Sequence, residues 1–493
     1  MYNHIKESWY EIFITTVYII NFLEILNLIF REKRSIEATI AWVLVLTTVP
    51  AIGCILYISF GRGVSKDNMF KIKETEDKIL KENIIDTQIK LERNDDFEPD
   101  LIGYKDMIYA LANSNNSHFT TNNSVEIFPE SKNFFESLLE ELKKAKNHIN
   151  IQFYIFKDDE IGNKIIDILI DKAQSGVEVR LLYDAVGSRL FSDKSIHRLK
   201  RSGVKVGAFF PSFMKIINFN VNYRNHRKIV VIDGNVGFIG GNNVGDEYLG
   251  KDPKFGYWRD THLKITGDSV KDLNIRFILD WRYTTKEDLV LDKYFNNETL
   301  ISPNDNSLEN IGLQIVSSGP DSTELDEIKY GYMKMIQKAK QYIYIQTPYF
   351  ILDKTLTDTL KIACFSGVDV RIMIPSKPDH PFVYWASSSY AGELLKYGAK
   401  LYTYDHNAFL HAKTIVVDDC VCSIGTANMD IRSFELNFEI NAFMYSSEIA
   451  KKQRLIFEND MLKSKEVTLD MYNSRSRYVR VKESISRLLS PIL

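Results

Sequence analysis

One pattern of residues occurs twice in the 493-residue chain, and this repeat constrains the fold more than any other feature. The pattern is H-x-K-x4-D-x6-G-x-x-N, with equivalent positions 185 residues apart. Its two copies consist of His226, Lys228, Asp233, Gly240 and Asn243, and of His411, Lys413, Asp418, Gly425 and Asn428. Two further segment pairs repeat, 149–152 with 343–346 and 175–180 with 366–371, at offsets of 194 and 191. The similar offsets predict two copies of one unit from about residue 125 to 493.

Helical and strand periodicities alternate within each copy. Residues 134–146 and 162–175 have helical spacing, whereas 149–156 and 177–184 have the apolar composition of buried strands. This alternation predicts an α/β fold with two duplicated domains packed about a pseudo-twofold axis. The expected division is a two-helix membrane anchor over 1–62, a charged stalk and polar linker over 63–124, and domains over 125–305 and 306–493.

The N-terminus contains two long apolar runs, Trp9–Phe30 and Ala38–Phe60, of 22 and 23 residues. Each is long enough to cross a bilayer as a helix, which takes about 20 residues. We therefore expect two transmembrane helices. Three basic residues lie in the connecting loop, and seven flank the other ends of the runs (Lys6, Arg62, Lys66, Lys71, Lys73, Lys78 and Lys81). The positive-inside rule places both termini and the large domains in the cytoplasm.

Charge and cysteine content exclude several classes of protein. The formal net charge is −3, which argues against a protein that holds nucleic acid by neutralising phosphates. The four cysteines show no C-x-x-C spacing and are too few for a disulfide framework in so long a chain. We expect no bound metal and no nucleic-acid partner.

The duplicated motif suits phosphodiester chemistry. Each His and Lys stand at i and i+2 at the start of a predicted strand, so the two side chains share one face. The following Gly240-Gly241 and Gly425-Thr426 turns would let the backbone approach an anion and bring the Asn243 and Asn428 amides to it. One imidazole can attack phosphorus while the other protonates the leaving alkoxide. The Lys and Asn pairs would bind the charged oxygens.

A histidine nucleophile needs an acceptor on its other ring nitrogen. The candidates are Asp260 and Glu439, each downstream of the motif strand in its own copy. Asp233 and Asp418 have two alternatives, a catalytic role or a structural one that fixes the turn after the strand. Among the other histidines, His262 and His380 are the two of interest. The stretch 475–493 has helical spacing and either packs on the domain, the commoner outcome, or lies on a membrane surface.

Through its two H-x-K-x4-D motifs the sequence resembles the phospholipase D superfamily, and more narrowly the bacterial cardiolipin synthases. Further segments that carry the likeness are 57–62, 240–247, 257–262, 378–381, 409–413 and 425–428. The resemblance implies two facing phospholipase D-like domains in a bacterial cell membrane protein. It also implies transfer between two phosphatidylglycerol molecules to give cardiolipin and glycerol, without metal or cofactor.

The resemblance further implies that His226 is the nucleophile and His411 the acid/base, an order that two nearly equivalent motifs leave open. Thr426 stands where the family has a glycine. A membrane-anchored phospholipase D hydrolase would share every motif, and a tethered phosphodiesterase or nuclease is the less favoured alternative. The oligomeric state, the acyl-chain preference and other donor or acceptor lipids are left open.

Overall fold

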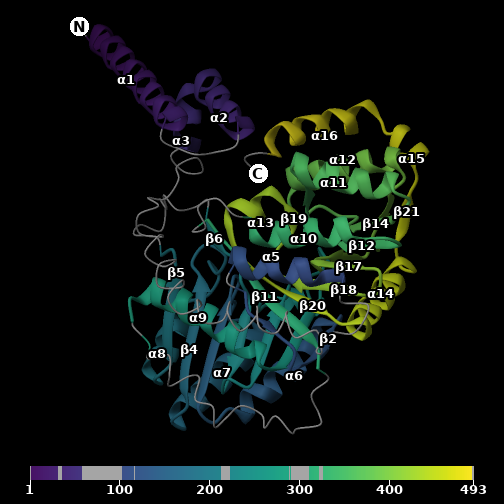
Figure 1. Ribbon diagram of the computed structural model, residues 1–493. Helices are drawn as coiled ribbons and strands as arrows, with labels where there is room; N and C mark the ends of the chain where they lie inside the picture. Colours follow the sequence, from purple (N-terminus) through teal and green to yellow (C-terminus); the bar gives the residue numbers. More distant parts are fainter. Residues whose placement is uncertain are drawn as a thin grey trace.

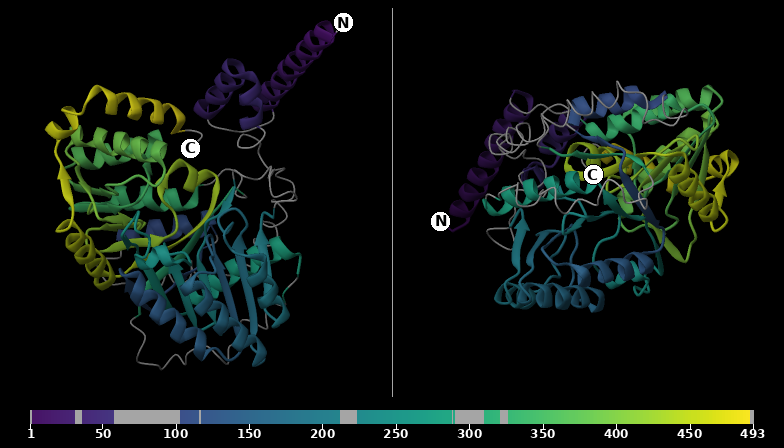
Figure 2. Two further views of the ribbon diagram at one scale, coloured as in Figure 1. Left: turned by 180° about the vertical axis from the view of Figure 1, so that it is seen from behind. Right: turned by 60° about the horizontal axis from the view of Figure 1, so that its bottom comes forward.

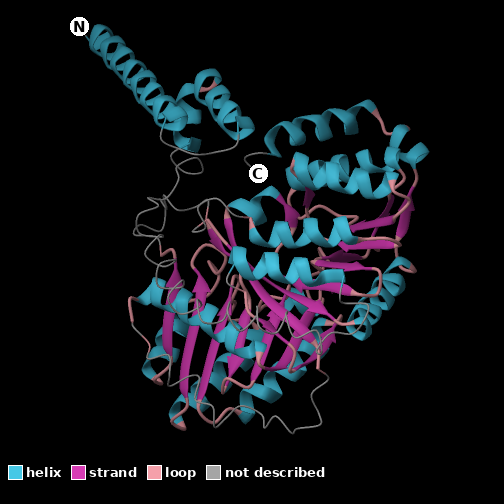
Figure 3. Cartoon of the chain, in the orientation of Figure 1, coloured by secondary structure: helices cyan, strands magenta, loops and turns pink. Residues whose placement is uncertain are grey.

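A computed structural model describes residues 2–30, 36–57, 103–115, 117–211, 223–287, 289, 310–320 and 326–490 (Figure 1). The charged stalk expected from 65 to 93 lies outside these residues. Two large sheets form the centre of the molecule, and helices cover their outer faces (Figure 3).

The first sheet has the order β2-β10-β8-β7-β3-β4-β5. Its strands are β2 (Asn123–Phe128), β3 (His148–Phe153), β4 (Glu178–Asp184), β5 (Lys205–Phe209), β7 (Ile229–Ile232), β8 (Val236–Gly240) and β10 (His262–Gly267). The helices of this half are α6 (Ser131–Lys144), α7 (Glu160–Gln174), α8 (Asp193–Arg201) and α9 (Ser269–Thr285). β3, β4 and β5 are parallel, and β7, β8 and β10 continue the sheet in antiparallel pairs.

The second sheet repeats this order as β11-β20-β18-β17-β12-β14-β15, with β1 added at one edge and β21 at the other. Its strands are β1 (Phe119–Thr120), β11 (Gly312–Ser318), β12 (Tyr342–Gln346), β14 (Asp369–Ile374), β15 (Lys400–Thr403), β17 (Thr414–Val417), β18 (Val421–Gly425), β20 (Asn437–Tyr445) and β21 (Lys465–Val467). Its helices are α10 (Glu327–Lys338), α11 (Lys354–Phe365), α12 (Pro381–Leu394), α13 (Ile431–Glu435), α14 (Ser447–Met461), α15 (Leu469–Asn473) and α16 (Arg477–Leu489). The matching strand orders bear out the duplicated α/β fold.

Apolar packing joins the two halves. One core contains Leu263 and Phe277 from the first half together with Leu410 and Ile440 from the second. Residues 105–115, which the sequence assigned to a polar linker, form the helix α5 (Lys105–Asn115). Its apolar face is buried against α10 and β11 of the second half, so this segment is part of the folded body.

Two short strand pairs cross between the halves. β6 (Arg224–Asn225), just before the first motif, pairs with the start of β20. In the same way β16 (Ala408–Leu410), just before the second motif, pairs with β9 (Tyr257–Arg259) of the first half. Each motif therefore begins against the other copy.

The N-terminal unit departs from the expected pair of spanning helices. α1 (Tyr2–Phe30) contains one run, Trp9–Phe30, that is long and apolar enough to cross a membrane. The second run is broken into α2 (Ile36–Thr48) and α3 (Pro50–Leu56), so the expected continuous second span is wrong for the described residues. The break follows from Pro50, which has no N–H to donate to the Leu46 carbonyl one turn earlier. Asn21 of α1 donates its amide to the Leu46 and Pro50 carbonyls, each at 3.0 Å.

Candidate active site

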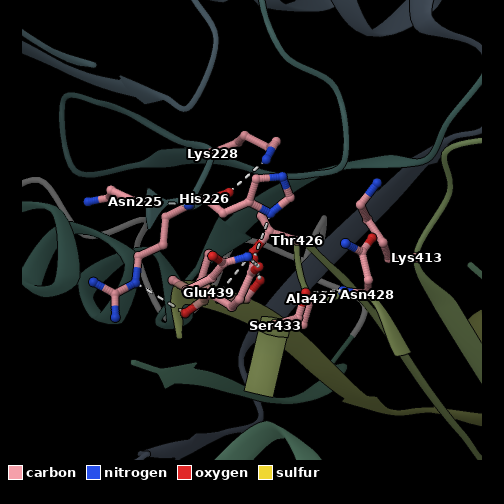
Figure 4. Close-up of polar contacts among 12 residues, drawn as sticks. Asn225, His226, Lys228, Lys413, Thr426, Ala427, Asn428, Ser433 and Glu439 are labelled. Atoms are coloured by element: carbon pink, nitrogen blue, oxygen red, sulfur yellow. Dashed lines mark hydrogen bonds and ion pairs between the residues drawn. The ribbon is translucent and has the colours of Figure 1, made fainter. Parts of the chain in front are cut away.

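Each motif histidine is paired with a carboxylate of the opposite half. His226 Nδ1 lies 2.9 Å from Glu439 Oε2, and His411 Nδ1 lies 2.6 Å from Asp260 Oδ2. Figure 4 shows His226 between Lys228 and Glu439, with Lys413 and Asn428 beside them. The two carboxylates are the candidates that the sequence indicated, and each lies beside the histidine of the other copy.

The crossing strand pairs explain this exchange. The His226 amide donates to the Phe438 carbonyl at 2.9 Å, and the His411 amide donates to the Arg259 carbonyl at 2.7 Å. Phe438 and Arg259 are the residues immediately before the two carboxylates. The two histidines are therefore held by the same backbone contact in both halves, which sets each imidazole beside the following carboxylate.

The Glu439 and Asp260 carboxylates are ionised acceptors. Burial alone would raise their pKa values, but His226 beside Glu439, and Lys413 and His411 beside Asp260, lower them. A carboxylate on Nδ1 keeps the proton there and leaves Nε2 with a lone pair. Burial is also the main cause that lowers the pKa of each histidine to about 4. Both imidazoles are thus neutral at pH 7 and suited to act as nucleophile or base.

The motif lysines lie beside the histidines and are buried. Lys228 Nζ donates to the His226 carbonyl at 2.6 Å. Lys413 Nζ donates to the His411 carbonyl and lies 2.9 Å from His411 Nδ1. Burial lowers the pKa of Lys228 to about 7 and that of Lys413 to about 8. Burial thus disfavours the charged form of both lysines, and a bound anionic substrate would favour it again.

The motif aspartates lie at the far ends of β7 and β17 and serve the backbone. Asp233 accepts amide protons from residues 146, 147 and 148 at 2.7–2.8 Å. Asp418 accepts them from residues 340, 341 and 342 at 2.6–2.9 Å. Both aspartates adopt φ near +54°, in the turn after the strand. Of the two alternatives for these residues, the geometry supports the structural one and not a catalytic one.

The motif asparagines line one cavity with the two histidines but differ in their contacts. Asn243 accepts from the Ile155 amide at 3.1 Å and donates to the Tyr248 hydroxyl at 2.8 Å. The Asn428 side-chain oxygen is buried and makes no hydrogen bond among the described residues. The amide of Asn428 is thus the more available of the two for a ligand.

The glycine turn after the first motif makes room for a protein anion. A Cβ on Gly241 would lie 2.0 Å from Asp260 Oδ1, so this residue allows the carboxylate to approach the backbone. Its counterpart Thr426 lies beside Glu439 and exchanges hydrogen bonds with the backbone of Ile440 at 2.9 and 3.2 Å. The glycine expected to admit a substrate anion instead accommodates Asp260.

A second layer of buried charge was not anticipated from the sequence. Asp280 of α9 accepts from Gln152 at 2.8 Å and pairs with Arg227 at 2.5 Å. In the other half Asp460 of α14 accepts from Gln346 at 2.8 Å and pairs with Arg259 at 2.8 Å. The available signal was the repeated I-x-I-Q segment, in which a glutamine lies at the end of β12 and next to the end of β3.

The cavity has a volume of about 440 Å³ and is shared by both halves. His226 and His411 line it together with Arg224, Arg432 and His380. His262 is not part of this wall, since it is buried and stacked on Phe134 at 3.9 Å. Within the described ranges, no group of three or more His, Cys, Asp or Glu side chains is arranged to hold a metal ion. The arrangement provides two neutral imidazoles, two lysines and an amide, as transfer of a phosphoryl-linked group requires.

Comparison with known proteins agrees with this chemistry. A family model described as cardiolipin synthase, PLD-like domain, matches residues 138–253 and 332–461, and a phospholipase D-nuclease N-terminal model matches 16–62. The major cardiolipin synthase ClsA of Bacillus subtilis is 49% identical over 98% of this chain and 99% of its own length. The cardiolipin synthase of Oceanobacillus iheyensis is 48% identical over 97% and 98%.

Among solved structures, the fold resembles phosphatidylserine synthase of Haemophilus influenzae, with a TM-score of 0.60 and 18% identity. That likeness covers 79% of this chain and all of the other. Two duplicated domains with paired H-x-K motifs, together with the family matches, define a member of the phospholipase D superfamily. Within it, the chain belongs to the cardiolipin synthase family and is an enzyme of the phosphatidyltransferase type.

Proposed function

We propose that the enzyme transfers a phosphatidyl group from one phosphatidylglycerol to a second, which gives cardiolipin and glycerol. The observation that carries this proposal is the pair of histidines in one cavity, each with a buried carboxylate on Nδ1. Such a pair can act on the two opposite sides of one phosphorus atom.

In the first half-reaction Nε2 of His226 attacks phosphorus, and the bond from phosphorus to the glycerol oxygen breaks. His411 gives its proton to that oxygen, so glycerol leaves and a phosphohistidine remains. The anionic phosphodiester and Asp260 both favour the protonated form of His411 once substrate is bound. Lys228, Lys413 and the Asn428 amide would bind the non-bridging oxygens.

In the second half-reaction neutral His411 takes the proton of the acceptor hydroxyl. The hydroxyl oxygen attacks phosphorus, the phosphorus–nitrogen bond to His226 breaks, and cardiolipin forms. Assignment of His226 as the nucleophile follows the family pattern, because the two sites have nearly the same geometry.

The N-terminal unit, over the proposed anchor 1–62, would attach the enzyme to the bacterial cell membrane. α1 would cross the bilayer, and its Leu28 packs with Trp42 and Leu46 of α2 and with Tyr57 at the end of α3. Asn21 satisfies backbone carbonyls near the break at Pro50, which favours burial of this unit in lipid. With α2 and α3 returning, the domains proposed over 125–305 and 306–493 would lie on the cytoplasmic side, as the basic residues of the sequence suggest.

The test is to incubate the purified full chain in detergent with phosphatidylglycerol alone and identify the products by mass spectrometry. Cardiolipin and glycerol in equal amounts are expected. Phosphatidate in place of cardiolipin would show a hydrolase, and it would overturn the proposed transferase.

A further inference from the structure

The duplicated site has one marked asymmetry of charge. At the offset of 185 residues, Arg224 corresponds to Phe409 and Arg432 corresponds to Glu247. Both arginines line the cavity, whereas neither counterpart does. The reacting groups are thus duplicated, but neither arginine has an arginine at the equivalent position of the other copy.

The local contacts maintain this asymmetry. Phe409 is buried against Trp258, with ring centroids 4.8 Å apart, and Glu247 is paired with Lys157 at 2.5 Å. On the other side Arg224 is half-buried on β6, two residues before His226, and its Nη1 donates to the Tyr223 carbonyl at 2.9 Å. Arg432 is half-buried on α13 from the second half. The two guanidinium groups therefore reach one cavity from opposite halves.

The two acidic residues of the cavity wall have hydrogen-bond partners of their own. Asp430 caps α13 by accepting from the Ser433 amide at 2.7 Å, and Asp379 accepts from the Tyr349 hydroxyl. Burial, and then the charge of Arg224, lower the pKa of Arg432, whereas the nearby Asp430 raises it, so the two guanidinium groups are close enough to interact. A half-buried pair of like charges is stabilised by an anionic ligand, and guanidinium groups match the geometry of phosphate.

We propose that Arg224 and Arg432 bind the phosphate of the acceptor phosphatidylglycerol, an inference that rests on the proposed function. The donor phosphate is held at the histidines, lysines and Asn428. The acceptor brings a second phosphate, which is not attacked and stays joined to the reacting hydroxyl through glycerol. This second negative charge requires a separate cationic subsite, whereas water or free glycerol as an acceptor does not.

The experiment uses two reactions of the full-length enzyme in mixed micelles. One is cardiolipin formation from phosphatidylglycerol, and the other is exchange of isotopically labelled glycerol into phosphatidylglycerol, in which the acceptor has no phosphate. Arg224→Gln and Arg432→Gln are each expected to lower the ratio of cardiolipin formation to exchange by roughly tenfold to a hundredfold, as expected for loss of a charged hydrogen bond. Lys164→Gln, at an exposed ion pair on α7, is the matched control with an unchanged ratio.

An unchanged ratio would overturn the proposed acceptor subsite, whether both activities are kept or both fall by the same factor. Failure of the proposed function would look different, because the unmodified enzyme would then form no cardiolipin.

A second inference comes from α16, whose amphipathic faces are reversed. The residues that it buries against the domain are polar, Glu483 and Ser486, followed by Ser490 just after the helix. Four of its apolar residues lie outward in one stripe at spacings of three and four, namely Tyr478, Val481, Ile485 and Leu488, with Tyr478 69% and Leu488 76% exposed, whereas Val479 and Leu489 are half-buried. A helix that contacts only water and its own domain has the opposite arrangement.

The surroundings of this stripe indicate an anionic bilayer as its partner. Arg477 and Arg480 are exposed on the same helix, and Lys482 lies 4.2 Å from the Tyr478 ring. Ser490 at the end of the helix lines the reaction cavity, as do His380 and Val383 at the start of α12. α16 lies at the same end of the molecule as α1–α3 in Figure 1 and in the left view of Figure 2. We infer that α16 rests in the membrane surface and holds the cavity at the lipid headgroups.

This contact is tested by lipid quenching, which needs no turnover. The full chain with Ile485→Trp is reconstituted into phosphatidylglycerol vesicles with or without brominated acyl chains, and the emission of the unmodified protein is subtracted. The added tryptophan at 485 is expected to be quenched, and one at the exposed Leu462, which follows α14, is not. Equal quenching at both positions would overturn the inference. The inference would also be overturned if position 485 were not quenched and crosslinking between chains showed that a second copy covers it.

Discussion

Glu439 accepts a hydrogen bond from the His226 imidazole at 2.9 Å, although the two residues are 213 positions apart in the chain. The equivalent bond of His411 to Asp260 spans 151 positions. Neither half therefore contains a complete histidine–carboxylate pair, and the reaction depends on correct docking of both domains.

Removal of either carboxylate charge should disable chemistry while the fold remains. Glu439→Gln and Asp260→Asn each remove the acceptor that sets the tautomer of the imidazole and stabilises its charged form. We expect turnover to fall by roughly 10²- to 10⁴-fold, as in other histidine–carboxylate pairs. The measurement is cardiolipin formation, with circular dichroism as the check on folding. Glu435→Gln on α13 is the control, and turnover within about threefold of wild type in the site variants would contradict the role.

The order of the two histidines can be read from a donor that needs no acid. A phosphatidyl ester of p-nitrophenol has a leaving group that departs without protonation. With this donor, His411→Ala should still release one equivalent of nitrophenol per enzyme, whereas His226→Ala should release none. The reverse result would make His411 the nucleophile. With phosphatidylglycerol as donor, both variants are expected to form no product and to remain folded.

The motif aspartates should affect stability more than chemistry. Asp233→Asn and Asp418→Asn each weaken three backbone hydrogen bonds to a carboxylate, with an expected loss of about 2 kcal/mol in the free energy of unfolding. A lower Tm in thermal unfolding is expected, with turnover at low temperature close to wild type. A large loss of turnover at an unchanged Tm would restore the catalytic alternative.

The pKa shifts predict an unusual dependence of kcat/KM on pH. The pKa of His226 is lowered to about 4, so the neutral nucleophile persists well below pH 6.5 and is lost only as pH falls towards 4. The pKa of Lys228 is lowered to about 7, so its positive charge in the free enzyme is lost as pH rises through 7. Activity should therefore decline on the alkaline side, and Lys228→Arg should move that decline to higher pH. A rate that is constant up to pH 10 would contradict this assignment.

Gly241 should tolerate no side chain. A Cβ at this position would overlap the Asp260 carboxylate, which holds His411. Gly241→Ala is expected to lower turnover by at least tenfold, since displacement of the partner mimics part of the loss in Asp260→Asn. The control is Gly103→Ala, because a Cβ at that position would meet open space. Gly176→Ala is less suitable, because φ at Gly176 is +91°. Normal turnover in Gly241→Ala would show that Asp260 can shift without cost.

The repeat predicted the duplicated fold and brought the right histidines, lysines and carboxylates to attention. It did not predict which carboxylate serves which histidine, because periodicity describes contacts within one copy and the short pairs β6–β20 and β9–β16 join two. The break before α3 could have been predicted from Pro50, but the second transmembrane helix was predicted from the length of the apolar run alone. Arg224 and Arg432 were missed because the sequence was searched for positions that match between the two copies, and each of these arginines occurs in one copy only.

The crossed pairs also bear on how such a chain arose. A single ancestral unit would have carried a histidine whose carboxylate partner belonged to another molecule, so it would have worked only as a homodimer. Fusion of two such units would turn that symmetric dimer into one polypeptide and would release its halves from being identical. The divergence of Phe409 from Arg224, and of Glu247 from Arg432, is the kind of change that only the fused form allows. An enzyme that must distinguish a lipid that gives its phosphatidyl group from one that receives it would benefit from that freedom.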